Sequence, residues 1–150
     1  MKRILTYLTI AILAVSFSSC RKLAEHGSFS GQWQVLSIDY PDGTVVDSPS
    51  HDLYYRFYRD VATVFNRKTH FGATGNILDY REKESFTLQF PYKAKLSQFA
   101  TLGMTDPDAT IDPENDEVEG YTVSFTIRKQ DSQTLIMTTQ YGVTLTCRKF

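Results

Sequence analysis

A run of acidic residues between Asp106 and Glu119 carries the side chains best suited to binding a metal ion. Six oxygen-bearing residues follow the ligand spacing of an EF-hand calcium loop: Asp106, Asp108, Thr110, Asp112, Glu114 and Glu117. However, Ile111 stands where that loop needs glycine for its sharp turn, and Pro107 and Pro113 interrupt it. The sequence therefore favours a solvated acidic loop, with a loose, weak calcium site as the alternative.

The other side chains with catalytic or metal-binding potential are scattered. His26, His51 and His70 lack the close spacing that gathers zinc ligands. No serine lies in a Gly-x-Ser-x-Gly motif, and the segment from Gly72 to Gly75 lacks the lysine and the length of a phosphate-binding loop. We therefore expect no catalytic residues, no cofactor and no enzymatic activity.

Cys20 follows a segment with the three-part layout of a secretory signal. Lys2 and Arg3 precede an uncharged stretch over residues 4–15, and small residues then lead to the cysteine. The apolar run is about 12 residues long, whereas a membrane-spanning helix needs roughly 20. The sequence therefore predicts a cleaved signal peptide over residues 1–19. The alternatives are an ordinary thiol near an ordinary cleavage site, or a short buried helix.

The tetrapeptide ending at Cys20 resembles the lipobox of bacterial lipoproteins, with Phe17 in place of the usual leucine. The resemblance implies a diacylglyceryl thioether on the sulfur and acylation of the freed amine, for example with palmitate. Two or more acyl chains anchor a protein stably, because each buried methylene contributes about 0.8 kcal/mol. Residues 20–28 would then form a lipidated tether to a membrane of the cell envelope. Arg21 and Lys22 replace the acidic run of surface-exported Bacteroidetes lipoproteins, which favours an outer-membrane anchor facing the periplasm.

Charge and cysteine content exclude some partners and bonds. Cleavage removes Lys2 and Arg3, which changes the formal net charge from −1 to −3. A chain without basic excess is a poor ligand for nucleic acid, and we expect none. If Cys20 carries lipid, Cys147 has no disulfide partner. Its place in an alternating pattern indicates a small buried side chain.

Alternation of apolar and polar residues dominates the rest of the chain and predicts antiparallel strands. Two stretches are clearest, with Phe86, Leu88, Phe90 and Tyr92 on one face of the first and Tyr121, Val123, Phe125 and Ile127 on one face of the second. Weaker strands are expected over residues 32–40, 53–59, 61–67, 76–83, 134–141 and 143–149. About eight short strands with tight turns predict an all-β sandwich or barrel. A short helix over residues 94–102 could cross the mouth of a barrel.

The aromatic and basic residues from 53 to 59 alternate as well. Such a pattern can bind sugars or nucleic acid by stacking, but a core strand explains it better in an exported protein. We expect one set to face the core and the other to face outward: Leu53, Tyr55 and Phe57 inside, and Tyr54, Arg56 and Tyr58 outside.

Gly31-Gln32-Trp33 opens the first predicted strand and resembles the lipocalin signature. The resemblance implies a single antiparallel, lipocalin-like barrel over residues 29–150, whose floor is closed by Trp33. In that signature the tryptophan packs near a basic side chain from a late strand, and Arg148 is the matching position. The stretch from Leu135 to Phe150 resembles the last hairpin of lipocalin-like lipoproteins common in Bacteroidetes. No second motif stands out, so no ligand class is implied.

Two functions remain open for such a membrane-anchored barrel. The first, which we favour, is binding of a small apolar or amphipathic ligand in the mouth or interior. The second is an interaction lipoprotein whose filled barrel docks an envelope protein. The interior volume discriminates between them, because an eight-stranded barrel is either just filled or holds one ligand. The large residues expected inside favour a filled barrel: Phe86, Phe90, Tyr92, Tyr121 and Phe125.

Overall fold

The computed structural model describes residues 26–47 and 52–150. The predicted signal peptide over residues 1–19, the lipidation at Cys20, most of the tether and His51 lie outside the described residues. Within the two described ranges, no helix is long and apolar enough to span a membrane.

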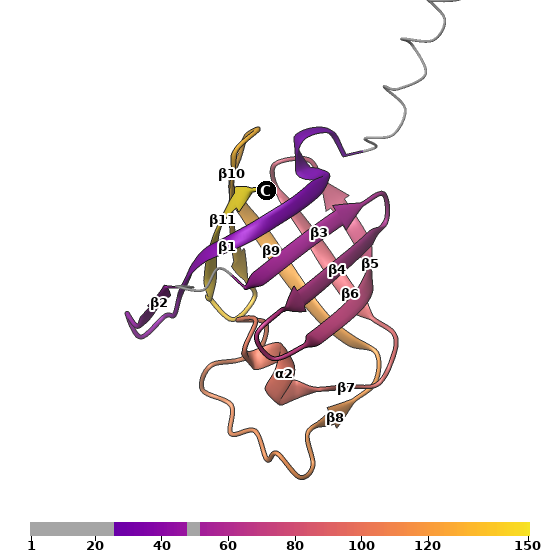
Figure 1. The fold of residues 1–150 in the computed structure, drawn as a ribbon, viewed down its shortest axis with the longest axis vertical. Helices are drawn as coiled ribbons and strands as arrows, with labels where there is room; N and C mark the ends of the chain where they lie inside the picture. The colour runs from indigo at the N-terminus through magenta and orange to yellow at the C-terminus, as the bar shows by residue number, and fades with distance from the viewer. Residues whose placement is uncertain (1–25, 48–51) are drawn as a thin grey trace, which may run out of the picture.

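The described chain forms a closed antiparallel barrel (Figure 1). Its eight strands follow one another around the barrel in chain order. They are β1 (Gly31–Asp39), β3 (Leu53–Tyr58), β4 (Val61–Asn66), β5 (Phe71–Arg81), β6 (Ser85–Phe90), β9 (Tyr121–Gln130), β10 (Thr134–Thr139) and β11 (Thr144–Lys149). The last strand, β11, pairs with β1 and closes the sheet. The predicted all-β barrel is therefore confirmed.

The remaining elements are short and lie at the edges of the barrel. Strand β2 (Val45–Asp47) pairs with β1 outside the closed circle, and β7 (Ala94–Lys95) pairs with β8 (Glu117–Val118) as a separate ribbon. The helix α2 (Leu96–Ala100) lies with this ribbon at one end, and the 3-10 turn η2 (Gly27–Phe29) lies at the other (Figure 1). We call these the α2 end and the η2 end. The short helix expected over residues 94–102 is confirmed.

The two clearest alternating stretches form neighbouring strands. Phe86 of β6 lies opposite Phe125 of β9, and both are buried as predicted. Tyr92 was expected on the same inner face, and this expectation is wrong because its side chain is 77% exposed. The physical reason is Pro91, which has no amide N–H to continue the ladder, so β6 ends at Phe90.

Strand β3 divides its side chains between the two faces nearly as predicted. Tyr55 and Phe57 are buried in the core with Leu53, while Arg56 is exposed. Tyr54 lies on the outer face with Arg56, as predicted, but it is buried there. Its ring stacks on Phe65 of β4, with 5.0 Å between the ring centroids. Cross-strand aromatic pairing can therefore bury a residue on the outer face of a barrel.

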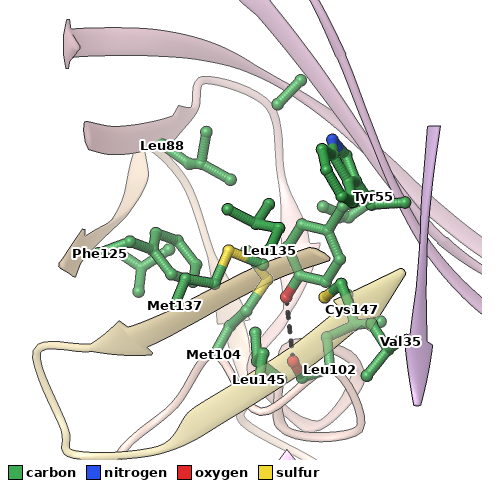
Figure 2. Close-up of a cluster of buried hydrophobic side chains, with 14 of the residues drawn as sticks. Val35, Tyr55, Leu88, Leu102, Met104, Phe125, Leu135, Met137, Leu145 and Cys147 are labelled. Atoms are coloured by element: carbon green, nitrogen blue, oxygen red, sulfur yellow. Dashed lines mark hydrogen bonds between the residues drawn. The ribbon is translucent and has the colours of Figure 1, made fainter. Parts of the chain in front are cut away.

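Among the described residues, a cluster of large buried side chains packs the interior of the barrel (Figure 2). Phe86 and Phe125 stack at 4.8 Å between centroids, and Tyr55 packs edge-on against Phe125. The buried hydroxyl of Tyr55 donates to the carbonyl oxygen of Leu102 at 3.1 Å, so its polar end is satisfied. Cys147 is 1% exposed in the same cluster, as predicted, and burial raises the pKa of its thiol. The barrel therefore contains its own core.

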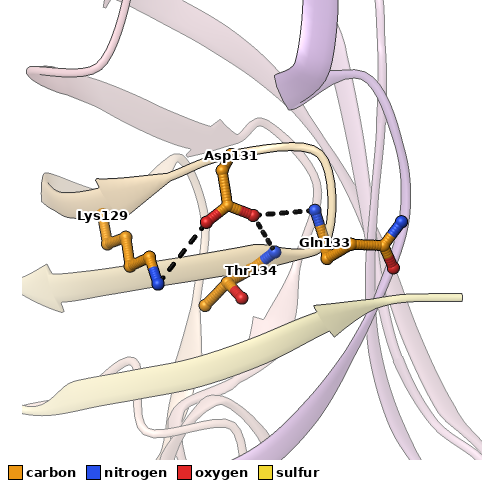
Figure 3. Close-up of polar contacts among 4 residues, drawn as sticks. All are labelled: Lys129, Asp131, Gln133 and Thr134. Carbon is orange, nitrogen blue, oxygen red and sulfur yellow. Dashed lines mark hydrogen bonds and ion pairs between the residues drawn. The ribbon is translucent and has the colours of Figure 1, made fainter.

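The turn between β9 and β10 is organised by one carboxylate (Figure 3). Asp131 accepts hydrogen bonds from the backbone amides of Gln133 and Thr134, and it lies 3.5 Å from the ammonium group of Lys129. These hydrogen bonds, most strongly the one from the Gln133 amide, hold the pKa of Asp131 below its ordinary value. Because they favour the ionised carboxylate, they stabilise the fold above the pKa of the unfolded state.

Asp131→Ala is expected to make the protein easier to unfold at neutral pH and to remove part of its acid sensitivity. The contribution of Asp131 is fully present above its unfolded pKa and is lost as the pH falls through its lower folded pKa. Urea midpoints measured from pH 7 down to pH 2.5 should therefore converge for the wild type and the variant. Lys129→Met, which keeps both backbone bonds, should retain the acid dependence. An Asp131→Ala effect as large at pH 2.5 as at pH 7 would contradict this assignment.

Candidate functional site

The η2 end of the barrel is closed by Trp33 and its neighbours. Trp33 is fully buried, and its indole N–H donates to the carbonyl oxygen of Phe29 at 2.8 Å. The ammonium nitrogen of Lys149 lies 4.3 Å from the centroid of the tryptophan ring, within cation–π range. The same nitrogen donates to the carbonyl oxygens of Ser28 and Ser30. These contacts tie the entering chain to the last strand.

Lys149, and not Arg148, is the basic side chain over Trp33. Trp33 pairs with Lys149 in the ladder between β1 and β11, and Gln34 pairs with Arg148. Successive side chains of a strand point to opposite faces, so Arg148 lies on the outer face and donates to Gln34 at 3.0 Å. The match of Arg148 to the lipocalin signature was therefore wrong by one residue. The sequence could have indicated Lys149, because residues 147 and 149 share a face of the strand and Cys147 was expected to be buried.

Aromatic side chains of the described residues pack together at both ends of the barrel. At the η2 end, Phe29 stacks on Phe57 with 4.1 Å between the ring centroids. At the α2 end, Phe99 of the helix is fully buried and stacks on Tyr121 at 4.7 Å. The hydroxyl of Tyr121 donates to the carbonyl oxygen of Met104, which fixes the following loop. Within the part of the chain that the structure describes, aromatic side chains therefore occupy both ends of the barrel.

An open hollow of about 530 Å³ lies at the edge of β5, between residues 70–74 and the chain over residues 90–94. We call it the β5 crevice, lined chiefly by His70, Gly72, Thr74, Phe90, Tyr92 and Lys93. Its volume falls in the usual range of about 300–1,000 Å³ for ligand sites. Sequence reasoning missed this site, although Pro91 marked the end of β6.

Comparisons with known proteins agree with this geometry. A family model described as a lipocalin-like domain matches residues 15–150. The chain belongs to the lipocalin-like domain family. No curated protein matches it.

Two solved structures share the lipocalin-like fold. A lipocalin-like protein from Bacteroides uniformis is 17% identical, with a TM-score of 0.54 over 83% of this chain and 100% of that chain. An uncharacterized protein from Bacteroides eggerthii is also 17% identical, with a TM-score of 0.52 over 81% of this chain and 99% of that chain. At this identity the likeness concerns the fold alone.

The acidic segment of the lipocalin-like barrel does not assemble a metal site. Asp106 accepts a hydrogen bond from the amide of Asp108, and Asp112 accepts one from the amide of Glu114, so these carboxylates cap their own local turns. Within residues 26–47 and 52–150, no group of three acidic, histidine or cysteine side chains could hold a metal ion. The calcium alternative for Asp106, Asp108, Asp112, Glu114 and Glu117 is therefore not carried further.

One carboxylate of this region is buried and serves the fold. Asp116 accepts hydrogen bonds from the backbone amide and the hydroxyl of Ser97, at the start of α2. The hydrogen bond from the Ser97 hydroxyl, more than the bond from its amide, holds the pKa of Asp116 below its ordinary value. A carboxylate kept ionised by its partners is a poor general acid, so its role is to attach the helix to the segment before β8.

Proposed function

We propose that the protein is a lipid-anchored interaction lipoprotein of the bacterial cell envelope, whose filled barrel docks an envelope protein. The observation that carries this proposal is the interior itself, in which Phe86, Phe125 and Tyr55 pack against one another in a fully buried cluster. A barrel filled by its own side chains presents its outer surface to partners. The sequence had favoured a small ligand over a docked protein, and the filled interior reverses that order.

The anchor is supported by the sequence before the barrel. Lipid on Cys20 would hold the mature chain at the membrane, and Phe29, the first core residue, follows nine positions later. A fully extended chain spans at most about 3.6 Å per residue, so the barrel would lie within roughly 30 Å of the membrane surface. Arg21 and Lys22 support an anchor in the outer membrane that faces the periplasm. A partner must then lie in the same envelope layer.

Binding of a small apolar or amphipathic ligand is the second candidate. The lipocalin-like fold favours it, because this fold is typical of binding proteins and not of enzymes. We propose no enzymatic activity. A small ligand would have to occupy a surface hollow such as the β5 crevice, since the described core is packed with side chains.

Mass spectrometry of the protein extracted from its own membrane tests both parts of the proposal. The N-terminal peptide should begin at Cys20 and carry the added mass of a diacylglyceryl group and an acyl chain. An unmodified peptide, or one that begins at Met1, would refute the anchor. Native spectra should show a stoichiometric protein partner, whereas a stoichiometric small apolar molecule would refute the docking function and support the second candidate.

A further inference from the structure

The β5 strand has an open edge beside the β5 crevice. Residues 71–76 pair with β4, but the pairing with β6 begins only at Asn76, opposite Gln89. Beyond that point Pro91 turns the chain away, and the following residues form β7, which pairs with β8. The part of β5 before Asn76 therefore has a strand neighbour on one side only.

The parity of the ladder shows which backbone groups face this edge. The amide of Ile77 donates to the carbonyl of Asp60, so the odd-numbered residues of β5 direct their backbone groups toward β4. The even-numbered residues direct theirs to the other side, where Asn76 meets β6. Gly72 and Thr74 consequently turn an N–H and a C=O each toward the crevice, and neither has a strand partner there. Such an edge is a template for pairing with another chain.

The side chains around this edge include a cation, Lys93, and no anion. Lys93 and His70 line the crevice, and no carboxylate is among the lining residues, although the protein as a whole is acidic. The exposed ring of Tyr92 and the edge of Phe90 add apolar surface. The lining therefore combines hydrogen-bonding backbone groups, a cationic side chain and aromatic surface.

A second hollow on the barrel wall lacks this combination. It has about 550 Å³ and is lined by Arg56, Tyr58 and Val61 among others. The strands beneath it, β1, β3 and β4, pair with one another along this stretch, so their ladders use the backbone groups. The open edge therefore distinguishes the β5 crevice from this second hollow.

We propose that an extended segment of the partner protein adds as a short strand to β5 at Gly72 and Thr74, with an acidic side chain beside Lys93. The proposal rests on the docking function above and names its site. An extended polypeptide carries alternating N–H and C=O groups, which can pair with the N–H and C=O groups of Gly72 and Thr74. A fatty acid or another simple amphiphile has no such groups. Side chains on one face of the added strand would contact Tyr92.

A model strand peptide tests the proposal on the mature chain with Cys20→Ser. The probe is acetyl-Thr-Val-Glu-Val-Thr-amide, titrated while the backbone amide resonances of the protein are recorded by NMR. Saturable shifts are expected at Gly72, Thr74 and Lys93. A peptide with lysine in place of its glutamate should bind about tenfold more weakly, because the charge pair becomes a repulsion. No saturable shift with either peptide would overturn the proposal.

Two variants and a control locate the binding. Thr74→Pro removes the amide that faces the crevice, leaves the odd-numbered donors to β4 intact and should abolish the shifts. Lys93→Glu should weaken binding of the acidic peptide about tenfold. This variant still tests the proposal if Thr74→Pro does not fold. Lys83→Glu makes the same charge change at the η2 end and should bind like the wild type. Equal weakening by Lys83→Glu, or binding that survives both crevice changes, would overturn strand addition.

The same variants separate this inference from the docking function. If the envelope partner binds Thr74→Pro as tightly as the wild type, docking stands and strand addition is refuted. If the peptide binds as expected but native spectra show no protein partner, the docking function is refuted and the strand-accepting edge stands. Competition by a free fatty acid for the shifted residues would instead place a small amphiphile in the crevice and overturn the polypeptide occupant.

Discussion

Phe125→Ala lowers the free energy of unfolding by about 3–5 kcal/mol, the usual cost of truncating a buried phenylalanine. The ring is 1% exposed and loses its stacking on Phe86 and its edge contact with Tyr55. The barrel wall around it is tied by ladders on both sides, so the space should remain as an apolar cavity. Cavities of this kind stay dry and bind benzene or xenon.

Thermal unfolding with and without benzene checks this result. Benzene should raise the melting temperature of Phe125→Ala, because a ligand that binds only the folded state stabilises it, and should leave the wild type unchanged. Tyr92→Ala removes a ring of similar size that is 77% exposed, and should change the stability by less than about 0.5 kcal/mol. A wild type that benzene stabilises as strongly as the variant would show that the native interior is not filled.

Trp33→Ala should cost a similar amount, about 3–5 kcal/mol, for a different reason. Trp33 joins the entering chain to the barrel, through its bond to the Phe29 carbonyl and its contact with Lys149. Trp33→Phe keeps most of the apolar surface but leaves that carbonyl without its indole donor, at a cost of about 1–3 kcal/mol. Urea unfolding followed by circular dichroism measures both changes.

The basic partner of Trp33 can be tested in the same series. Lys149→Met removes the cation over the ring and the bonds to the two serine carbonyls, and should destabilise the protein. Lys129→Met removes an exposed lysine at the same end of the barrel and should cost much less. Equal effects of the two substitutions would show that the contact of Lys149 with the tryptophan contributes nothing to stability.

Much of this fold follows from local patterns in the sequence. The alternation around Phe86 and Phe125 predicted two core strands because burial on one face of a sheet enforces a period of two. The buried thiol of Cys147 followed from the same rule. Trp33 was expected at the barrel floor only through the lipocalin resemblance, since a single buried tryptophan has no pattern of its own.

The remaining features depend on which strands become neighbours. Alternation alone predicted that the inner face of β6 extends to Tyr92. The strand ends at Phe90 instead, because Pro91 has no amide N–H for the next ladder bond. The open edge at Gly72 and Thr74 appears only once β5 is known to lie between β4 and β6. The acidic loop has the residue spacing of a calcium site, but Asp106 and Asp112 accept hydrogen bonds from backbone amides of their own turns.

The filled interior is tested most directly by titrating the mature chain, with Cys20→Ser, with carbon-13-labelled palmitate while the ring resonances of Phe86 and Phe125 are observed by NMR. Both rings are buried inside the barrel and stack on each other, so a ligand in the interior must displace them. If the barrel is filled, neither ring resonance should move, and any fatty-acid contact should be confined to surface residues. Saturable, stoichiometric shifts of the two rings would contradict the filled barrel and with it the docking function.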